Sequence, residues 1–339
     1  MTKRRTVEAT APARIDLAGG TLDIWPLNLM FQPSMTVNMA VTIMAKAVVE
    51  PRKDRKVILA SEDQGIRVEF GSLASVHHDH KLGLVSRLVG RFAKDGGGFT
   101  VTTSGQSPAG AGLGGSSSLA IALCSALSWH TGARMNKAGL LNIAKDVEAA
   151  HLGIPTGLQD YLAALYGGAN VFHFPAGGFV RERISPDMST QLENRIALFY
   201  SGASRSSGIN NWEMFRLVME KDKKTVRLFG RIAEHAREAS SALAREDFPG
   251  FTKAVKEEWA TRKKLFPSIS TPAIDSAMKA GFKAGAEAAR ICGAGGGGCF
   301  FMIAPEGLMD EAAGAVEKAG AQRLSYRISR AGVKASAQG

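Results

Sequence analysis

A stretch of glycines and serines one third of the way along the chain has the residue types that bind an anion. Residues 107–127 read SPAGAGLGGSSSLAIALCSAL, in which glycines precede three serines and an apolar run that predicts a helix. The first N–H groups of a helix lack intrahelical partners and carry partial positive charge, and glycines let the backbone wrap an anion closely. A phosphate at this helix start would satisfy several of those donors. The candidate phosphate-binding residues are Pro108, Gly110, Ala111, Gly112, Leu113, Gly114, Gly115, Ser116, Ser117 and Ser118.

The charge pattern around this stretch also favours an anionic ligand. No aspartate or glutamate occurs between Gly96 and Lys145. Removing fixed negative charge around a loop lowers the electrostatic cost of bringing a phosphate to it. The serine hydroxyls can cap the helix, bind phosphate oxygens or ligate Mg²⁺.

Three well-known phosphate-binding sequences do not account for the stretch. A P-loop needs a lysine after its last glycine, and none follows Gly115. The spacing Gly110-x-Gly112-x-x-Gly115 matches the dinucleotide pattern, but the acidic residue expected about 20 positions later is missing, since the next one is Asp146. The H-R-D and D-F-G strings of protein kinases do not occur. A glycine loop that only permits tight helix–strand packing remains an alternative.

Three motifs in a fixed order resemble those of one enzyme family. Pro108–Ser117 follows the pattern P-x-x-x-G-L-G-G/S-S-S, and APARIDLAGGTLDIWPL and CGAGGGGCFFMI occupy residues 11–27 and 292–303. Together they are similar to the phosphate loop, the N-terminal substrate motif and the C-terminal glycine loop of the GHMP kinases, named for galactose, homoserine, mevalonate and phosphomevalonate substrates. The resemblance spans most of the chain and implies an ATP-dependent small-molecule kinase.

One branch of that family matches best. Residues 148–174, EAAHLGIPTGLQDYLAALYGGANVFHF, resemble the segment of D-glycero-D-manno-heptose 7-phosphate kinases in which Q-D-Q-Y-A-A and G-G-F-N-F occur. Residues 19–23 read G-G-T-L-D instead of the usual G-G-G-T-D, and residues 289–292 lack the lysine and serine associated with heptose kinases. Asp160 is followed directly by Tyr161, so a second glutamine is missing. The resemblance implies phosphorylation of a sugar or sugar phosphate at a hydroxyl.

The resemblance assigns a catalytic pair. Asp160 matches the family's active-site aspartate, which takes or orients the proton of the acceptor hydroxyl during transfer. Arg14 matches the basic residue of the N-terminal motif, whose fixed charge would neutralise the moving phosphoryl group. An aspartate with an ordinary pKa of about 3.9 is a weak base for an alcohol, so orientation should matter as much as basicity. The alternatives are a helix N-cap for Asp160 and a strand-end arginine for Arg14.

The resemblance also implies the cofactors ATP and Mg²⁺. Ser116 and Glu148, which lies 12 positions before Asp160, match the family's pair of Mg²⁺ ligands. One carboxylate, one hydroxyl, phosphate oxygens and waters suit an octahedral site for a hard cation. Ser117 and Ser118 are the weaker serine candidates, and a solvated helix glutamate is the alternative for Glu148.

Substrate contacts are implied at both ends of the chain. Asp23 matches an aspartate that binds sugar hydroxyls, and such groups reject analogues lacking those hydroxyls, although a turn-forming aspartate is the alternative. Arg205 is a candidate for a substrate phosphate or the γ-phosphate, or else a solvated loop arginine. The second glycine loop, Gly293–Gly298, would bring backbone to the substrate and the triphosphate unless it is a plain hairpin. The predicted substrate contacts are Gly19, Gly20, Asp23, Gln159, Arg205, Gly295, Gly296 and Gly297.

Periodicity predicts the elements that must place these residues. Before residue 185 we expect strands over 6–15, 99–103 and 170–174, helices over 116–130 and 136–152, and a short helix ending at Tyr166. After it we expect a strand over 196–200, long helices over 211–246 and 249–265, a helix over 274–284, strands over 288–292 and 299–303, a helix over 308–319 and a last strand over 323–329.

The predicted fold class is α+β, in two domains. The tail from residue 274 reads helix-strand-strand-helix-strand, which is typical of an α+β sandwich. Residues 1–185 should carry the phosphate loop and the catalytic residues, and residues 186–339 the second glycine loop. The resemblance implies a ribosomal-S5-like N-terminal α/β domain, a ferredoxin-like C-terminal domain and an active site in the cleft between them.

Composition limits the partners. The chain is 45% hydrophobic and 22% charged, with no apolar run of membrane-spanning length and no apolar secretory segment behind its first charges, so we expect no membrane partner. The net charge of +11 comes from short, scattered basic clusters, so we expect no nucleic-acid partner. Three cysteines without metal-ligand spacing suggest free thiols and a cytoplasmic location. We expect a small-molecule substrate and a monomer or homodimer.

Two other functions stay open. A different branch of the family would phosphorylate a hexose, a hexose phosphate, a cyclitol or a mevalonate-type substrate, although Asp23 and the Gln159-Asp160-Tyr161 run favour a sugar. A non-catalytic regulator with the same fold is the second, although the intact Arg14 and Asp160 favour an enzyme.

Overall fold

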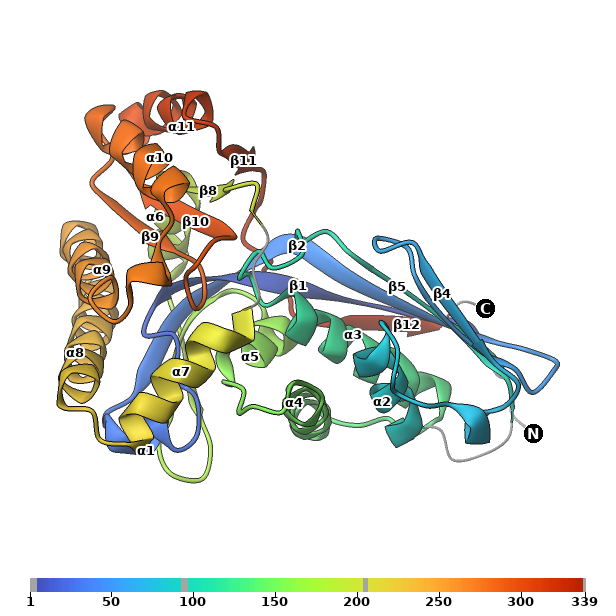
Figure 1. Ribbon diagram of the computed structural model, residues 1–339. Coiled ribbons are helices and arrows are strands. Elements are labelled where there is room, and N and C mark those ends of the chain that lie inside the picture. The colour runs from blue at the N-terminus through green and yellow to red at the C-terminus, as the bar shows by residue number, and fades with distance from the viewer. Residues whose placement is uncertain (1–4, 93–96, 204–206, 338–339) are drawn as a thin grey trace.

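The computed structural model describes residues 5–92, 97–203 and 207–337, which form two β-sheets and their helices (Figure 1). The larger sheet has the strand order β12-β1-β2-β5-β3-β4, and β6 pairs with β2 while β7 pairs with β6. Its strands are β1 (Val7–Ala18), β2 (Met35–Pro51), β3 (Val57–Ser61), β4 (Ile66–Phe70), β5 (Phe99–Gly105), β6 (Ala169–His173), β7 (Val180–Arg183) and β12 (Lys334–Ala337).

Strands β1 and β2 lie side by side in this sheet and are its two longest strands. They pair antiparallel from Val7 opposite Val49 to Ala18 opposite Val37, with register shifts after Pro12 and Asp16. The last eight residues of β1 are all buried, because other elements cover both faces of the strand there. Any charged side chain in this part of β1 must therefore find its partners inside the protein.

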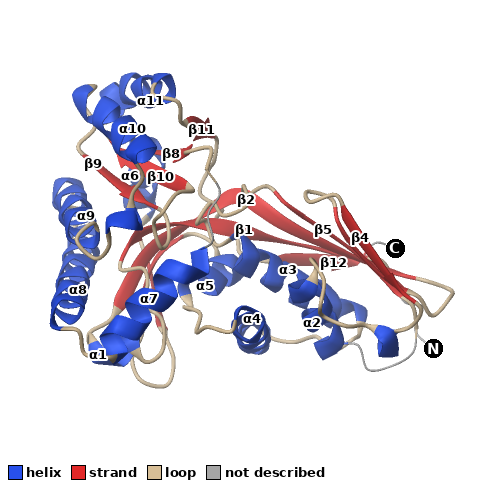
Figure 2. Ribbon diagram, in the orientation of Figure 1, coloured by secondary structure: helices blue, strands red, loops and turns tan. Residues whose placement is uncertain are grey.

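One face of the larger sheet carries four helices, α2 (Gly83–Phe92), α3 (Gly115–His130), α4 (Lys137–Leu152) and α5 (Gln159–Tyr166) (Figure 2). Helix α3 is buried from Ala120 to Ser128 because it packs between strands β1 and β2 and the helices α2 and α4. Asn136 caps α4 by accepting the Gly139 N–H, and Gly153 ends the helix in the left-handed region at φ 69°.

The smaller sheet is antiparallel and has the order β11-β8-β10-β9. A single hydrophobic cluster joins the two sheets, with Ile15 from β1 and Phe199 and Phe300 from the smaller sheet among its members. The strands are β8 (Ile196–Tyr200), β9 (Ala288–Ile291), β10 (Cys299–Ile303) and β11 (Gln322–Leu324). The remaining helices are α1 (Leu27–Met30), α6 (Pro186–Arg195), α7 (Ser207–Met219), α8 (Lys223–Ala244), α9 (Phe248–Arg262), α10 (Pro272–Lys283) and α11 (Met309–Lys318).

The predicted long helix over residues 211–246 is wrong, because the chain turns within it. Helix α7 ends at Met219, Lys221 has a left-handed φ of 60°, and Asp222 starts α8 by accepting the Thr225 N–H. A side-chain cap of this kind begins a new helix although the hydrophobic period continues across the turn.

The end of the chain also differs from the prediction. The strand predicted over 323–329 covers only Gln322–Leu324, and β12, which was not predicted, pairs antiparallel with β1, with Val7 opposite Ala337. Its sequence, KASA, is too short and polar to predict a strand without its partner. The domain boundary near residue 185 stays a prediction. Within the described ranges, no helix combines the length and the apolar character needed to cross a bilayer.

A buried charge cluster connects β1 to the C-terminal elements. Its members Asp16, Glu258, Arg262 and Arg290 are at most 1% exposed. Arg290 places its Nε 2.5 Å from Glu258 Oε2 and its NH2 3.0 Å from Asp16 Oδ2. Arg262 pairs with Glu258 Oε1 at 2.8 Å. Burial opposes the charge of Arg290, but Asp16 and Glu258 outweigh burial and raise the pKa of its guanidinium above the ordinary value.

Glu258→Gln should destabilise the fold strongly. The substitution leaves Arg262 and Arg290 buried with one matching carboxylate instead of two, and breaking a buried pair from one side costs about 3–5 kcal/mol. Urea denaturation measures the loss in the free energy of unfolding. The matched control is Glu257→Gln on the same helix, whose side chain is 43% exposed and should cost less than about 1 kcal/mol. If both variants lose the same small amount of unfolding free energy, the cluster does not hold β1 to the C-terminal elements.

Candidate active site

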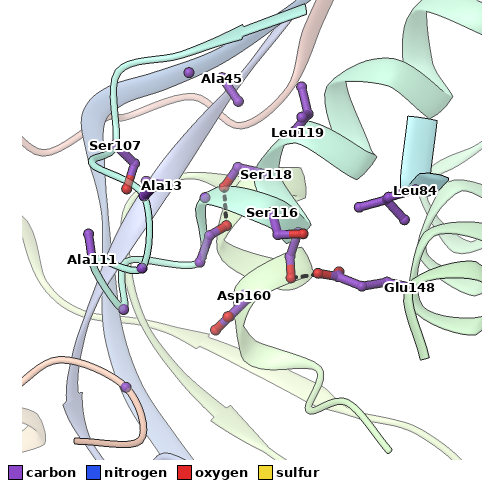
Figure 3. A pocket seen from close by; sticks show the side chains of 18 of the residues that line it. Ala13, Ala45, Leu84, Ser107, Ala111, Ser116, Ser118, Leu119, Glu148 and Asp160 are labelled. Carbon is purple, nitrogen blue, oxygen red and sulfur yellow. Dashed lines mark hydrogen bonds between the residues drawn. The ribbon is translucent and has the colours of Figure 1, made fainter. Parts of the chain in front are cut away.

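A pocket of about 710 Å³ lies where the glycine-serine stretch meets β1, α4 and the loop before α5 (Figure 3). This volume falls within the range of small-molecule and cofactor sites. Elements from both parts of the chain line it, since Asn211, Gly293 and Ala294 join the N-terminal residues. The predicted site residues in its wall are Arg14, Pro108, Gly110, Ala111, Gly112, Gly114, Gly115, Ser116, Ser117, Ser118, Glu148 and Asp160.

The glycine stretch needs glycine for two reasons. Gly110, Gly112 and Gly114 have φ values of 68°, 76° and 72°, a region that side chains rarely adopt. A Cβ atom at Gly114 would also lie 3.0 Å from Cγ of Asp160. The loop therefore passes close to the carboxyl group of Asp160, and α3 begins directly after it at Gly115.

The three serines at the start of α3 have different environments. Ser116 is exposed within the pocket wall. Ser117 is buried and donates to Glu148 Oε2 at 2.9 Å. The Ser118 hydroxyl lies 2.8 Å from the carbonyl of Pro12 and 2.9 Å from that of Gly114, so it joins the helix start to β1. Of the three hydroxyls, that of Ser116 is thus the most available to a ligand.

Arg14 and Asp160 form an ion pair at the wall of the pocket. Arg14 places Nε 2.8 Å and NH2 2.6 Å from Asp160 Oδ1, and NH1 donates to the carbonyl of Gly112 at 2.6 Å. The side chain of Arg14 is 5% exposed and that of Asp160 is 26% exposed. Burial lowers the pKa of the guanidinium, but the carboxylates of Asp160 and Asp16 outweigh burial and raise it above its usual value. Arg14 is a permanent cation here.

Glu148 lies beneath the serines and accepts two hydrogen bonds. Ser117 donates to its Oε2 at 2.9 Å, and Tyr161 donates to the same atom at 2.6 Å. Burial raises the pKa of Glu148, while the hydroxyls of Ser116, Tyr161 and Ser117 favour its charged form. Figure 3 shows Ser116, Glu148 and Asp160 grouped at one part of the pocket. Their oxygens are the ligand types that Mg²⁺ prefers.

Asp23 and Gln159 are buried beside the start of α5. Asp23 is 3% exposed and its Oδ2 accepts the Gln159 N–H at 2.8 Å, so it satisfies a free donor of the helix start. A Cβ at Gly157 would collide with the Asp23 carboxylate. Burial raises the pKa of Asp23 to about 6. Among the described residues, Oε1 of Gln159 is buried without a hydrogen-bond partner.

The predicted substrate glycines at the end of β1 contact the C-terminal part of the chain. Gly19, at φ 80°, donates its N–H to Glu258 Oε1 at 3.1 Å. The carbonyl of Gly20 accepts from Arg262 NH2 at 2.8 Å. Helix α9 thus holds the segment that leads to Asp23. The predicted substrate contact Arg205 lies outside the described residues.

The second glycine loop packs directly on the first. Cys299 donates its N–H to the carbonyl of Ala111 at 2.7 Å, and a Cβ at Gly298 would lie 2.6 Å from the carbonyl of Gly110. Gly293 reaches the pocket wall, whereas the Gly296 N–H donates to the carbonyl of Ile269 at 2.7 Å. The predicted contacts Gly295, Gly296 and Gly297 have positive φ values of 79°, 84° and 130°.

Several site residues were not predicted. Tyr161, fully buried beside Asp160, hydrogen-bonds Glu148, and burial raises its pKa well above the usual value. The buried cluster of Asp16, Glu258, Arg262 and Arg290 also escaped prediction. One signal was present, since Arg290 is the single charge in the apolar run 288–292. A charge at such a place requires an internal partner.

Comparison with known proteins identifies the family. The family model for the GHMP kinases N terminal domain matches residues 83–168, and that for the GHMP kinases C terminal matches residues 239–322. A D-glycero-alpha-D-manno-heptose 7-phosphate kinase of Campylobacter jejuni is 27% identical over 311 residues, which cover 89% of this chain and 90% of that protein. A mevalonate kinase of Thermococcus sibiricus is 27% identical over 346 residues, which cover 97% of this chain and 98% of that protein.

A solved structure agrees with the fold. The crystal structure of a D-glycero-D-manno-heptose 1-phosphate kinase from Bacteroides thetaiotaomicron has a TM-score of 0.81 at 20% identity and covers 98% of this chain and 99% of its own. The predicted α+β fold class is thereby confirmed, with the two matched domains in the expected order. Because both domain models of the family match in order, this chain belongs to the GHMP kinase family.

Proposed function

We propose that this chain transfers the γ-phosphoryl group of ATP to a hydroxyl of a sugar phosphate of the heptose 7-phosphate type. The observation that carries this proposal is the Arg14–Asp160 ion pair, which lies against the glycine loop in one pocket. A fixed cation and a carboxylate beside a phosphate-binding loop suit transfer to an alcohol. The relative named as a heptose 7-phosphate kinase supports the sugar class.

The glycine loop and the start of α3 would hold the triphosphate of ATP. The first N–H groups of α3 have no carbonyl partner within the helix, and Gly112 and Gly114 leave the loop backbone without a side chain at those two positions. Farther along the same pocket, Leu82, Leu84 and Val85 form an apolar wall that suits a nucleotide base.

Ser116 and Glu148 would hold Mg²⁺. The exposed hydroxyl of Ser116 and the carboxylate of Glu148 are hard oxygen donors in the same pocket wall, so the donor set fits this cation. When bound, Mg²⁺ supplies neutralisation of negative charge on the phosphate oxygens. Ser117 and Tyr161 both donate to Oε2 of Glu148, so Oε1 would be the oxygen that meets the cation.

Asp160 and Arg14 would act on the acceptor. Arg14 engages Oδ1 of Asp160 with two nitrogens, which leaves Oδ2 for the acceptor hydroxyl. The carboxylate orients that hydroxyl and takes its proton as the bond to phosphorus forms. Arg14 stays charged and offsets the negative charge of the transferring group. Asp23, next to the start of α5, would contact the sugar hydroxyls.

A phosphate elsewhere on the substrate would need a further cation. Arg262 and Arg290 are already matched by Glu258 and Asp16, so their charge is not available. Arg205 remains our candidate for this contact. The backbone of the second glycine loop, with Gly293 in the pocket wall, would close the site over the substrate.

Mevalonate-type phosphorylation is the second candidate, because a mevalonate kinase aligns with 97% of this chain. ADP release should be measured with heptose 7-phosphate, free heptose, hexoses, hexose 6-phosphates, a cyclitol and mevalonate. We expect the highest kcat/KM for heptose 7-phosphate. Faster turnover of mevalonate would replace the sugar proposal, and no turnover of any compound would support a non-catalytic regulator.

Asp160→Asn should abolish most of the turnover, at some cost in stability because Arg14 loses the carboxylate that matches its enclosed charge. General-base and orienting roles contribute about 10²–10⁴-fold to rate, so kcat should fall by about that factor. The control Asp146→Asn removes an exposed carboxylate that pairs with Lys145 on α4 and should leave kcat unchanged. A stopped assay for phosphorylated sugar measures both, and calorimetry with ATP confirms that nucleotide still binds. Retention of near-normal kcat in Asp160→Asn would remove Asp160 from the chemistry.

Asp23→Asn should change how stability depends on pH. The pKa of Asp23 rises from 3.8 in the unfolded chain to about 6 in the fold, so the folded state holds the extra proton between these values. The stabilisation is therefore present below pH 3.8 and is lost as pH rises through 6, by about 3 kcal/mol in total. Asparagine does not titrate, so the variant should gain about that much relative to the wild type between pH 4 and 7.

Urea denaturation across this pH range measures the difference in the free energy of unfolding between variant and wild type, with Asp146→Asn, which removes an exposed carboxylate, as the control. If the difference in unfolding free energy between Asp23→Asn and the wild type does not change with pH, the Asp23 carboxyl is solvated and its pKa is not raised. If Asp23 contacts the sugar hydroxyls, KM for the acceptor should rise at least tenfold in Asp23→Asn, while KM for ATP should stay within about twofold.

A further inference from the structure

We propose that Tyr161 is a positioning residue for the Mg²⁺ site, holding the carboxylate of Glu148 in the orientation that receives the cation. This inference rests on the proposed function, which assigns Glu148 to the metal. Tyr161 directly follows Asp160, at the place where the similar heptose kinase segment has a second glutamine.

The contact between the two side chains is short and enclosed. The Tyr161 hydroxyl donates to Glu148 Oε2 at 2.6 Å, and it lies 3.3 Å from Thr156 Oγ1. Tyr161 is 0% exposed and Glu148 is 4% exposed. A hydrogen bond to an ionised carboxylate in such surroundings is about twice as strong as a neutral one.

A second hydroxyl completes the arrangement. Ser117 donates to the same oxygen, Oε2, at 2.9 Å. Two donors from different helices, α3 and α5, therefore converge on one oxygen of a carboxylate that α4 carries. This convergence fixes the rotation of the carboxylate plane, and Oε1 is the oxygen that neither donor uses. Groups that orient a ligand in this way typically change metal affinity by about 10–100-fold when removed.

The place of Tyr161 in the chain links two parts of the site. It directly follows Asp160 in α5, and Asp23 satisfies the N–H of Gln159 one residue before Asp160. One short helix thus carries the acceptor carboxylate and the group that orients Glu148. A shift of α5 would move both together, so the chain at this point couples placement of the metal to placement of the acceptor.

Tyr161→Phe removes the hydroxyl and keeps the ring. We expect binding of Mn²⁺, used as the probe ion with a non-hydrolysable ATP analogue and followed by electron paramagnetic resonance, to weaken about 10–100-fold. KM for Mg²⁺ should rise by a similar factor, while KM for the acceptor stays within twofold. The matched control is Tyr166→Phe on the same helix, where the ring of Tyr166 contacts Lys137 and Arg181, and it should leave both values unchanged.

A double-mutant cycle separates positioning from general support. If Tyr161 acts through Glu148, adding Tyr161→Phe to Glu148→Gln should not weaken Mn²⁺ binding further. An independent loss in the double variant, or unaltered Mn²⁺ binding in Tyr161→Phe, overturns the inference. Should Tyr161→Phe fail to fold, as judged by circular dichroism, Ser117→Ala removes the other donor and must weaken Mn²⁺ binding, or the inference is wrong.

The same measurements distinguish this inference from the proposed function. A wild-type protein that binds Mn²⁺ with nucleotide and turns over a sugar, beside an unaffected Tyr161→Phe variant, rejects the role of Tyr161 and leaves the kinase proposal standing. A wild-type protein that shows neither metal-nucleotide binding nor turnover overturns both.

Discussion

The guanidinium of Arg14 is the contact on which the site depends. Its Nε and NH2 reach Asp160, 146 residues later, and its NH1 reaches the carbonyl of Gly112, 98 residues later. Because the group is enclosed, these hydrogen bonds are stronger than they would be in water, and an unmatched charge there would be costly. The strand β1, the glycine loop and the helix α5 are therefore fixed relative to one another by one side chain.

The C-terminal part of the chain is fitted to the same strand by a second set of contacts. Asp16, two residues beyond Arg14, pairs with Arg290, and the N–H of Cys299 joins the second glycine loop to the first. The glycines at both loops allow backbones to meet where any side chain would intervene. The placement of the end of β1 and of the first glycine loop thus follows from the same packed junction.

The local parts of this arrangement could be predicted from the sequence, and the long-range parts could not. The glycine loop and the helices after it are specified by neighbours in the chain, and their predicted starts at Ser116 and Asn136 lie within one residue of the observed ones. Arg290 and Asp16 are 274 residues apart, and the sequence around either residue does not predict its partner. Arg205 falls outside the described residues, and the roles of the site residues in catalysis remain predictions.

Pairing of β12 with β1 has a consequence for synthesis on the ribosome. The residues opposite each other, such as Val7 and Ala337, lie far apart in the sequence, so β12 is translated long after β1. Until the late segment emerges, that side of β1 is an unpaired strand edge, which is a template for association with other chains. A nascent chain of this protein therefore exposes an unpaired edge on β1 until β12 has been translated.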